Sequence, residues 1–171
     1  MALVIKYLGK EPKIDPTAVI FPNAMLIGDV EVGSESSIWP YSVLRGDRGK
    51  ITLGSQVNFQ DHCVAHGTVK IGNRVGVAHN SVLHDCEIED DVLVGIGSVI
   101  LDGARVGSFS IIGAGSVVTE KTVIPPNSLA VGVPAKVIKK TTEELINRIK
   151  DNVRLYLELS QNHDIPGKSG T

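Results

Sequence analysis

Apolar residues recur at every sixth position along most of the chain. A small or β-branched residue usually lies four positions after each of them, two positions before the next apolar residue. Alternation places this small residue and the next apolar residue on the inner face of one short strand. Glycine often comes directly after the apolar residue, which indicates a turn. The apolar positions are Ile14, Ile20, Leu26, Val32, Ile38 and Leu44, then Leu53, Phe59, Ala65, Ile71, Val77 and Leu83, and then Ile88, Val94, Ile100, Val106, Ile112, Val118 and Ile124.

This period predicts a solenoid. A six-residue repeat matches neither the 3.6-residue period of a helix nor the alternation of a hairpin sheet. Three units close a triangular coil of about 18 residues, and the whole series predicts about six coils. At ~4.8 Å between strands the prism is roughly 30 Å tall. We therefore expect an all-β solenoid, a parallel β-helix, over residues 1–138.

A helical pattern follows the repeat. The repeat is predicted to end in an extended segment at Pro125-Pro126 and Val133-Pro134. Thr141 and Glu144 then predict a capping box. We expect an amphipathic helix of five to six turns within residues 139–163, packed along the prism or on a neighbouring chain, and a flexible tail over 164–171. One face of that helix carries Leu145, Ile149, Val153, Tyr156 and Ser160.

The register of the repeat breaks twice. The step from Leu44 to Leu53 is nine residues, so three residues are inserted at RGDRGK. The step from Leu83 to Ile88 is five, so one residue is missing just after His84. Interruptions of a regular pattern often lie beside functional sites. The alternative is a simple loop and a tightened corner.

Composition narrows the function classes. Apolar residues make up 42% of the chain but aromatic residues only 4%, which favours a narrow interior. Seventeen basic and nineteen acidic residues form no basic stripe, so nucleic acid is not an expected partner. The apolar start of MALVIKYLGK is too short for a signal peptide or a membrane span. Cys63 and Cys86 without a secretion signal predict reduced, buried thiols and a cytoplasmic location.

Four of the five histidines lie between Asn58 and Asp85. Ala65 and Leu83 occupy the same place in adjacent coils, and His66 and His84 each follow that place by one residue. The two imidazoles should therefore stack at one corner, about one strand spacing apart. That separation allows them to share an ion.

His79 is predicted at a different corner. One side of the triangle, on the order of 15 Å, separates it from His84, whereas histidine nitrogens lie ~2 Å from a bound zinc ion. One chain therefore cannot bring all three rings together, but a second copy can. Such a heterologous contact closes into a homotrimer. Three neutral imidazoles and an open position are typical of a catalytic zinc site, although imidazole also suits iron and cobalt.

His62 does not share this position and is expected at a surface or an interface. His163 is expected in a frayed helix end without a role.

The ordered motifs resemble the γ-class carbonic anhydrase family. They are Arg45-Gly46-Asp47, Asn58-x-Gln60-Asp61-x4-His66, His79-x4-His84 and the exit Gly132-Val133-Pro134-Ala135-Lys136. The resemblance covers Ile14 to His163. It implies a left-handed β-helix and the hydration of carbon dioxide to bicarbonate by a carbonate dehydratase, a lyase.

The resemblance also implies roles for single residues. His66 and His84 resemble the ligand pair of one subunit, and His79 resembles the ligand from its neighbour. Gln60 resembles the residue that hydrogen-bonds hydroxide or bicarbonate at the metal, and Asn58 resembles a polar residue of the same pocket. Three further residues resemble supporting groups, namely Arg45 and Asp61 as an intersubunit ion pair and Asp47 as a partner near the site.

Two positions depart from well-studied family members. Arg48 stands where those members have an acidic residue. The chain after His66 returns directly into the repeat, whereas those members carry an acidic loop with the proposed proton shuttle. The sequence thus resembles a shorter subgroup of the family, in which helix residues like Tyr156 line the pocket. Packing in the core or at an interface is the other expectation for Tyr156.

Two other functions remain open on the sequence. Many hexapeptide-repeat proteins are acyltransferases, so acyl transfer or hydrolysis of a coenzyme A thioester, with one histidine as general base, is one alternative. A metal-binding trimeric scaffold without catalysis is the other.

Overall fold

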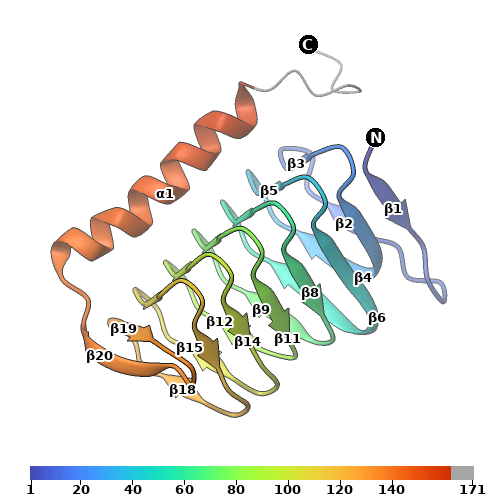
Figure 1. The fold of residues 1–171 in the computed structure, drawn as a ribbon. Helices are drawn as coiled ribbons and strands as arrows, with labels where there is room; N and C mark the ends of the chain where they lie inside the picture. The colour runs from blue at the N-terminus through green and yellow to red at the C-terminus, as the bar shows by residue number, and fades with distance from the viewer. Residues whose placement is uncertain (163–171) are drawn as a thin grey trace.

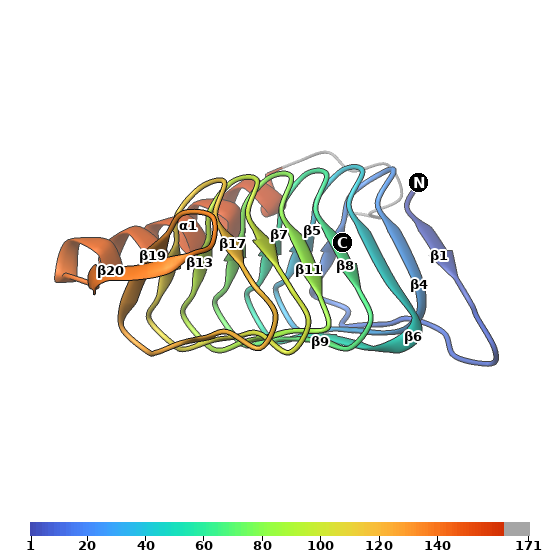
Figure 2. The same cartoon turned by 60° about the horizontal axis from the view of Figure 1, so that its bottom comes forward.

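Most six-residue units of the sequence form a short strand that ends at, or one residue beyond, the apolar residue of the unit. The computed structural model describes residues 1–162. Successive strands pair in parallel, so that the chain winds in coils stacked along one axis (Figures 1 and 2). The helix α1 (Glu143–Gln161) lies along the outside of the stack.

The strands form two sheets. The larger has twelve strands, and its two arms meet at β6. The second has eight strands, of which only β20 is antiparallel to its neighbour. The twelve-stranded sheet contains β1 (Leu3–Ile5), β2 (Lys13–Ile14), β4 (Met25–Val32), β6 (Val43–Leu53), β8 (Val64–His66), β9 (Val69–Ile71), β11 (Val82–His84), β12 (Glu87–Ile88), β14 (Val99–Ile100), β15 (Arg105–Val106), β17 (Val117–Val118) and β18 (Val123–Ile124). The eight-stranded sheet contains β3 (Val19–Ile20), β5 (Ser37–Ile38), β7 (Asn58–Phe59), β10 (Gly76–Val77), β13 (Leu93–Val94), β16 (Ile111–Ile112), β19 (Ser128–Val131) and β20 (Lys136–Lys140).

The repeat extends further than the sequence analysis predicts. Seven parallel strands stack in the second sheet, from β3 to β19, so the solenoid has about seven turns rather than six. Ala130 continues the series six residues after Ile124 and pairs with Ile112 of the coil below. The prediction that the repeat ends at Pro125-Pro126 is therefore wrong. The two prolines occupy the turn between strands, where no ladder hydrogen bond is lost.

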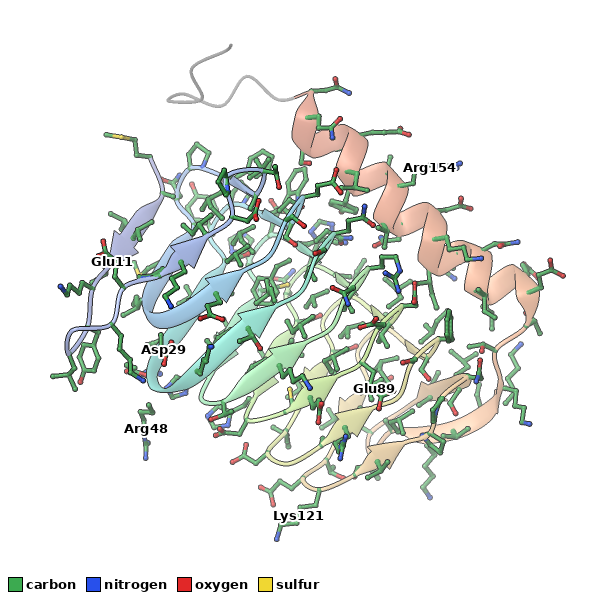
Figure 3. All side chains as sticks on the ribbon, turned by 180° about the vertical axis from the view of Figure 1, so that it is seen from behind. Glu11, Asp29, Arg48, Glu89, Lys121 and Arg154 are labelled. Atoms are coloured by element: carbon green, nitrogen blue, oxygen red, sulfur yellow. The ribbon has the colours of Figure 1, made fainter. Side chains whose placement is uncertain are left out.

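The insertion after Leu44 is a strand and not a loop. β6 continues through it for 11 residues and pairs along β4, with one register shift between Gly28 and Val30. The ribbon of β4 and β6 therefore rounds one corner of the prism and joins two of its faces into one sheet. Figure 3 shows Arg48 pointing away from the molecule at this corner.

The interior holds one layer of aliphatic side chains along the whole axis. Most members of the sixth-residue series have no exposed surface. The small residues that precede each strand share this interior, and serine is accommodated because its hydroxyl bonds a carbonyl of an adjacent coil. Ser42 donates to the Gln60 carbonyl at 2.6 Å, and Ser98 donates to that of Gly113 at 3.0 Å. Among the described residues, no buried side-chain polar atom lacks a partner.

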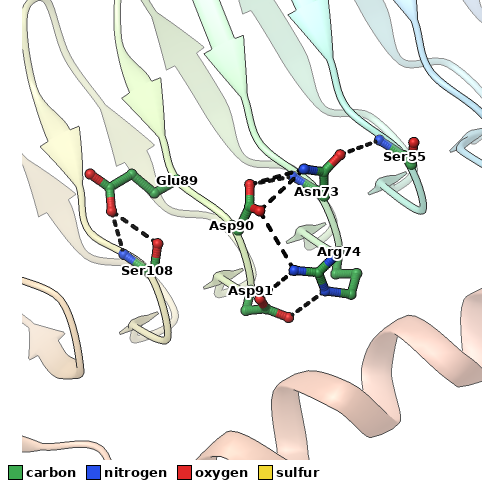
Figure 4. A network of polar contacts seen from close by, with 7 residues as sticks. All are labelled: Ser55, Asn73, Arg74, Glu89, Asp90, Asp91 and Ser108. Carbon is green, nitrogen blue, oxygen red and sulfur yellow. Dashed lines mark hydrogen bonds and ion pairs between the residues drawn. The ribbon is translucent and has the colours of Figure 1, made fainter.

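A polar ladder fixes a second corner of the prism, close to α1 (Figure 4). The Asn73 carboxamide accepts from the Ser55 backbone N–H at 2.9 Å, and Asp90 accepts from the Asn73 backbone N–H at 2.8 Å. The backbone bond from Asn73 is the main reason that the pKa of Asp90 is lowered. Arg74 adds a bidentate pair to Asp91, at 2.7 and 2.8 Å. Each coil is thus tied to the next through its turn.

The helix packs on its own solenoid, which decides between the two predicted positions. Ile149 is 1% exposed and packs with Leu93 and Ile111 of the eight-stranded sheet. Further along, Tyr156 packs edge-on against Trp39, with ring centroids 5.1 Å apart.

The helix begins one residue later than the predicted capping box. Thr142 is the N-cap, and its side chain accepts from the Leu145 backbone N–H. The predicted cap, Thr141, donates its hydroxyl to the Phe109 carbonyl instead.

Within residues 1–162, no helix has the length and apolar character that crossing a membrane requires. The tail at 164–171 and His163 lie outside the described residues.

Replacing a fully buried member of the repeat should destabilise the whole solenoid. Ile112→Ala removes buried methyl groups from the continuous core, and we expect a loss of ~2–5 kcal/mol in the free energy of unfolding. The matched control is Ile138→Ala at a side chain that is 58% exposed, where the change should stay within about 0.5 kcal/mol. Denaturant unfolding measures both, and equal effects would contradict the assignment of the core.

The two cysteines should be chemically silent in the folded protein. Both thiols are free, and burial raises the pKa of Cys63 to about 12. Because thiolate is the reactive form, a thiol-specific chromogenic reagent at pH 8 should find none in native protein and two per chain after denaturation. Rapid reaction of native protein would show that the coils open readily.

Candidate metal centre

His66 and His84 lie on top of one another. They end β8 and β11, and the register of these strands makes them direct partners, as the repeat predicts. Their ring centroids are 5.1 Å apart, and Nδ1 of His66 is 3.1 Å from Nε2 of His84. The parallel ladder alone produces this stacking, because it repeats each position of a coil directly above the last.

In each ring, the nitrogen that faces away from the other histidine, called the outer nitrogen, contacts a carboxylate. Asp47 Oδ1 lies 3.1 Å from Nε2 of His66, and Asp102 Oδ1 lies 2.6 Å from Nδ1 of His84. An ionised carboxylate only accepts hydrogen bonds, so each of these outer nitrogens must carry the proton. In neutral rings the inner nitrogens, Nδ1 of His66 and Nε2 of His84, then present lone pairs to each other. Only a cation between them, a proton or a metal ion, makes this contact favourable.

The dimensions of the pair fit one metal ion. Two ligand nitrogens at ~2.0–2.1 Å from a tetrahedral zinc ion lie roughly 3.3 Å apart, close to the observed 3.1 Å. Asp85 lies at the same corner, with Oδ2 3.4 Å from Nδ1 of His84. Among groups of three or more acidic, histidine or cysteine residues in residues 1–162, only His84, Asp85 and Asp102 bring their ligand atoms close enough together to hold an ion.

The β4–β6 corner delivers Asp47 to this pair. Arg45 donates to Asp47 Oδ2 at 2.7 Å, and this bond, followed by the one from His66, keeps the pKa of the Asp47 carboxyl below its usual value. Arg45 therefore has a partner within its own chain. The intersubunit pair of Arg45 with Asp61 stays a prediction, since a single chain does not test it.

His79 lies elsewhere, in the turn two residues after β10 of the eight-stranded sheet. Its Nδ1 is 2.9 Å from Asp61 Oδ2, which again requires a proton on Nδ1. Nε2 is then the acceptor for the Tyr156 hydroxyl at 3.2 Å. Tyr156 thus both packs on Trp39 and reaches His79, and burial is the main cause of its raised pKa.

Gln60 and Asn58 join the His79 face and not the His66–His84 corner. Both side chains are 2% exposed. Gln60 donates to the Asn58 side-chain oxygen at 2.8 Å, and its own oxygen accepts from the His79 backbone N–H at 3.3 Å. Asn58 in turn donates to Asn152 of α1 at 3.1 Å. Beside them, a groove of about 580 Å³ runs between α1 and the eight-stranded sheet, lined mainly by aliphatic side chains.

The predicted site residues thus divide into two groups on separate faces. His66, His84, Asp47 and Arg45 form one group, and His79, Asp61, Gln60 and Asn58 form the other. His62 belongs to neither; it is exposed, as predicted, and stacks on Tyr41 at a centroid distance of 5.2 Å.

Asp102 and Asn152 were not among the site residues predicted from the sequence. Asp102 had a detectable signal, because the missing residue after His84 shortens the step from Leu83 to its partner Ile100 to 17 positions. Asp102 consequently lies above Asp85 and next to His84. Asn152 carried no such signal, since only the docking of α1 decides which of its residues face the sheet.

Comparisons with known proteins agree with this fold. Residues 85–120 match the family described as bacterial transferase hexapeptide (six repeats). The structure superposes on a hexapeptide transferase family protein from Anaplasma phagocytophilum with a TM-score of 0.92 at 38% identity, covering 94% of this chain and 98% of that one. The fold and the stacked histidines thus define a hexapeptide-repeat protein, and the predicted class, an all-β parallel solenoid with one C-terminal helix, is confirmed.

Sequence relatives define the family more narrowly. The chain is 46% identical to a protein named probable carbonic anhydrase in Methanocaldococcus jannaschii, over 83% of this chain and 92% of the relative. It is 40% identical to the mitochondrial γ carbonic anhydrase 2 of Arabidopsis thaliana, over 94% of this chain. It spans only 61% of the length of that plant protein. The chain belongs to the γ-class carbonic anhydrase family.

Proposed function

We propose that this protein is a metal-dependent carbonic anhydrase that hydrates carbon dioxide reversibly to bicarbonate. One observation carries the proposal. Asp47 and Asp102 fix the protons of His66 and His84 on their outer nitrogens, so that two lone pairs converge at 3.1 Å. Such a pair favours a metal ion over an empty space, and the family relationship supports the reaction.

The third ligand comes from a second copy. His79 lies in the turn after β10 of the eight-stranded sheet, whereas the histidine pair ends strands of the twelve-stranded sheet. A contact between these two different surfaces is heterologous, and three copies close it into a ring. The homotrimer then has three sites, and each brings Gln60 and Asn58 with His79 to the histidine pair of the next chain.

The chemistry follows from this combination. A metal ion held by three histidines lowers the pKa of a water ligand to about 7, which makes a nucleophile available at neutral pH. Tyr156 must release Nε2 of His79 for that nitrogen to become a ligand. Asn58 and the backbone of His79 hold the Gln60 carboxamide, and we propose that its second N–H donates to the oxygens of carbon dioxide or bicarbonate. We propose zinc as the metal, and iron and cobalt suit the same ligands.

Proton release should limit the rate. The chain passes from β8 to β9 through Gly67 and Thr68 alone, so no acidic loop follows His66. Arg48 points away from the molecule and supplies no carboxylate that would carry the proton away. Each turnover nevertheless releases one proton, which must leave through buffer or through the carboxylates at the site.

A cytoplasmic location is part of the proposal. It is supported by the two free cysteines, because buried thiols that stay unpaired are typical of a reducing compartment.

Hydrolysis of a coenzyme A thioester is a second candidate, and the groove beside His79 is the observation that favours it. A space of about 580 Å³ exceeds what carbon dioxide needs and could hold an acyl chain. The three histidines would hold the same metal ion for either reaction, so assays with both substrates on one preparation separate the two functions. A scaffold without catalysis would bind the metal and hydrate carbon dioxide no faster than free metal in buffer.

Loss of either stacked histidine should remove the metal and the activity. For His66→Ala or His84→Ala we expect metal affinity to fall by more than roughly 100-fold, beyond the loss for an outer-shell partner. Elemental analysis and stopped-flow hydration of carbon dioxide on the same samples measure this. The matched control is His62→Ala, an exposed ring on the same solenoid, which should retain both. Hydration by metal-free wild-type protein would refute the proposal.

A mixed assembly tests the shared site directly. His84→Ala breaks the pair but keeps His79, and His79→Ala does the opposite. Every mixed cyclic trimer then contains one intact site, so random co-assembly of equal amounts should restore about a quarter of the wild-type metal content and activity. Each variant alone should have neither. No recovery in mixtures proven to be mixed trimers would mean that the three histidines do not share a site across chains.

A further inference from the structure

The carboxylate of Asp102 makes the shortest polar contact of the histidine pair. Its Oδ1 is 2.6 Å from Nδ1 of His84. Asp102 follows β14 in the next coil, and the shortened turn after His84 brings it over Asp85. Within residues 1–162 its side chain has no other hydrogen-bond or ion-pair partner, and it is 55% exposed. Nothing in the packing of the solenoid therefore requires an acid here.

We propose that Asp102 is a positioning residue for the metal centre, an inference that rests on the proposed function. Its carboxylate accepts the Nδ1 proton of His84 and thereby fixes the tautomer of the ring. Nε2 then keeps its lone pair toward Nδ1 of His66. Metal-bound histidines commonly donate their other nitrogen to a carboxylate, which orients the ring and raises its basicity as a ligand.

Asp85 cannot replace Asp102 in this role. Its Oδ1 accepts from the Thr68 backbone N–H at 2.7 Å, so the side chain is engaged in the turn between β8 and β9. It also packs on Gly67, where a built Cβ would lie 2.5 Å from Asp85 Oδ1. Its contact with Nδ1 of His84 is 3.4 Å, beyond a good hydrogen bond. Asp85 shapes the corner, and Asp102 sets the ligand.

Each candidate ligand has one such carboxylate. Asp47 faces His66, Asp102 faces His84, and Asp61 faces His79. All three acids fix a proton on the nitrogen opposite the one that faces the shared site. Asp102 is the cleanest of the three to test, because Asp47 also pairs with Arg45 and Asp61 is predicted to pair with Arg45 of a second copy.

Asp102→Asn tests the role. The amide is nearly the same shape, but its N–H₂ can donate to Nδ1 and shift the proton of His84 to Nε2, where it blocks the ligand. We expect zinc affinity, measured by competition with a chelating dye, to fall by about 10–100-fold. Visible spectra of the cobalt-loaded protein should change in step. Asp102→Glu, which keeps the charge and the acceptor, should recover part of the affinity.

Glu120→Gln is the matched control. Glu120 is an exposed acid in the turn one coil further along the same corner, where the Lys121 backbone N–H bonds the Asp102 carbonyl. The zinc affinity of Glu120→Gln should equal that of wild type. Without metal, all variants should unfold at the same temperature as metal-free wild type. Asp102→Asn with wild-type affinity and spectrum would overturn the inference and leave the proposed function intact. If Asp102→Asn binds zinc more weakly but the wild type does not hydrate carbon dioxide, the inference stands and the proposed function is refuted. Wild type that binds no zinc would overturn both.

Discussion

The parallel register between successive coils is the constraint on which the rest of the structure depends. Each strand pairs with the strand one coil below, so a residue type repeated along the sequence becomes a column in space. Aliphatic columns fill the axis, serine hydroxyls close onto adjacent carbonyls, and polar columns tie the corners (Figure 4). His66 over His84 is one such column, and its separation is set by the ladder.

Departures from the repeat supply the chemistry that the repeat cannot. The insertion after Leu44 extends β6 around a corner and brings Asp47 to His66. The missing residue after His84 tightens the turn two coils further along at the same corner and brings Asp102 to His84. A uniform solenoid would stack the two rings but leave their protons free to lie between them. The two irregular turns hold the protons outside, which prepares the pair for a cation.

The two faces that carry site residues are incomplete on their own. One has two candidate metal ligands and no group placed to hold a substrate, and the other has Gln60, Asn58 and a single histidine whose nitrogens are both engaged. The docking of α1 belongs to the second face, because Asn152 and Tyr156 hold Asn58 and His79. The helix therefore supports the site as well as covering the sheet. This division is why we assign the function to an assembly of chains.

The sequence alone determined the solenoid, because a six-residue apolar period has one simple solution in space and fixes which residues stack. It therefore predicted the strands, the core and the pairing of His66 with His84. It ended the repeat too early, since prolines in a turn look like a terminus. Only the tertiary structure decided the remaining contacts. Turn geometry and helix packing decide where α1 docks, bring Asp61 to His79 and bring Asp102 to His84. A periodic pattern does not encode either of them.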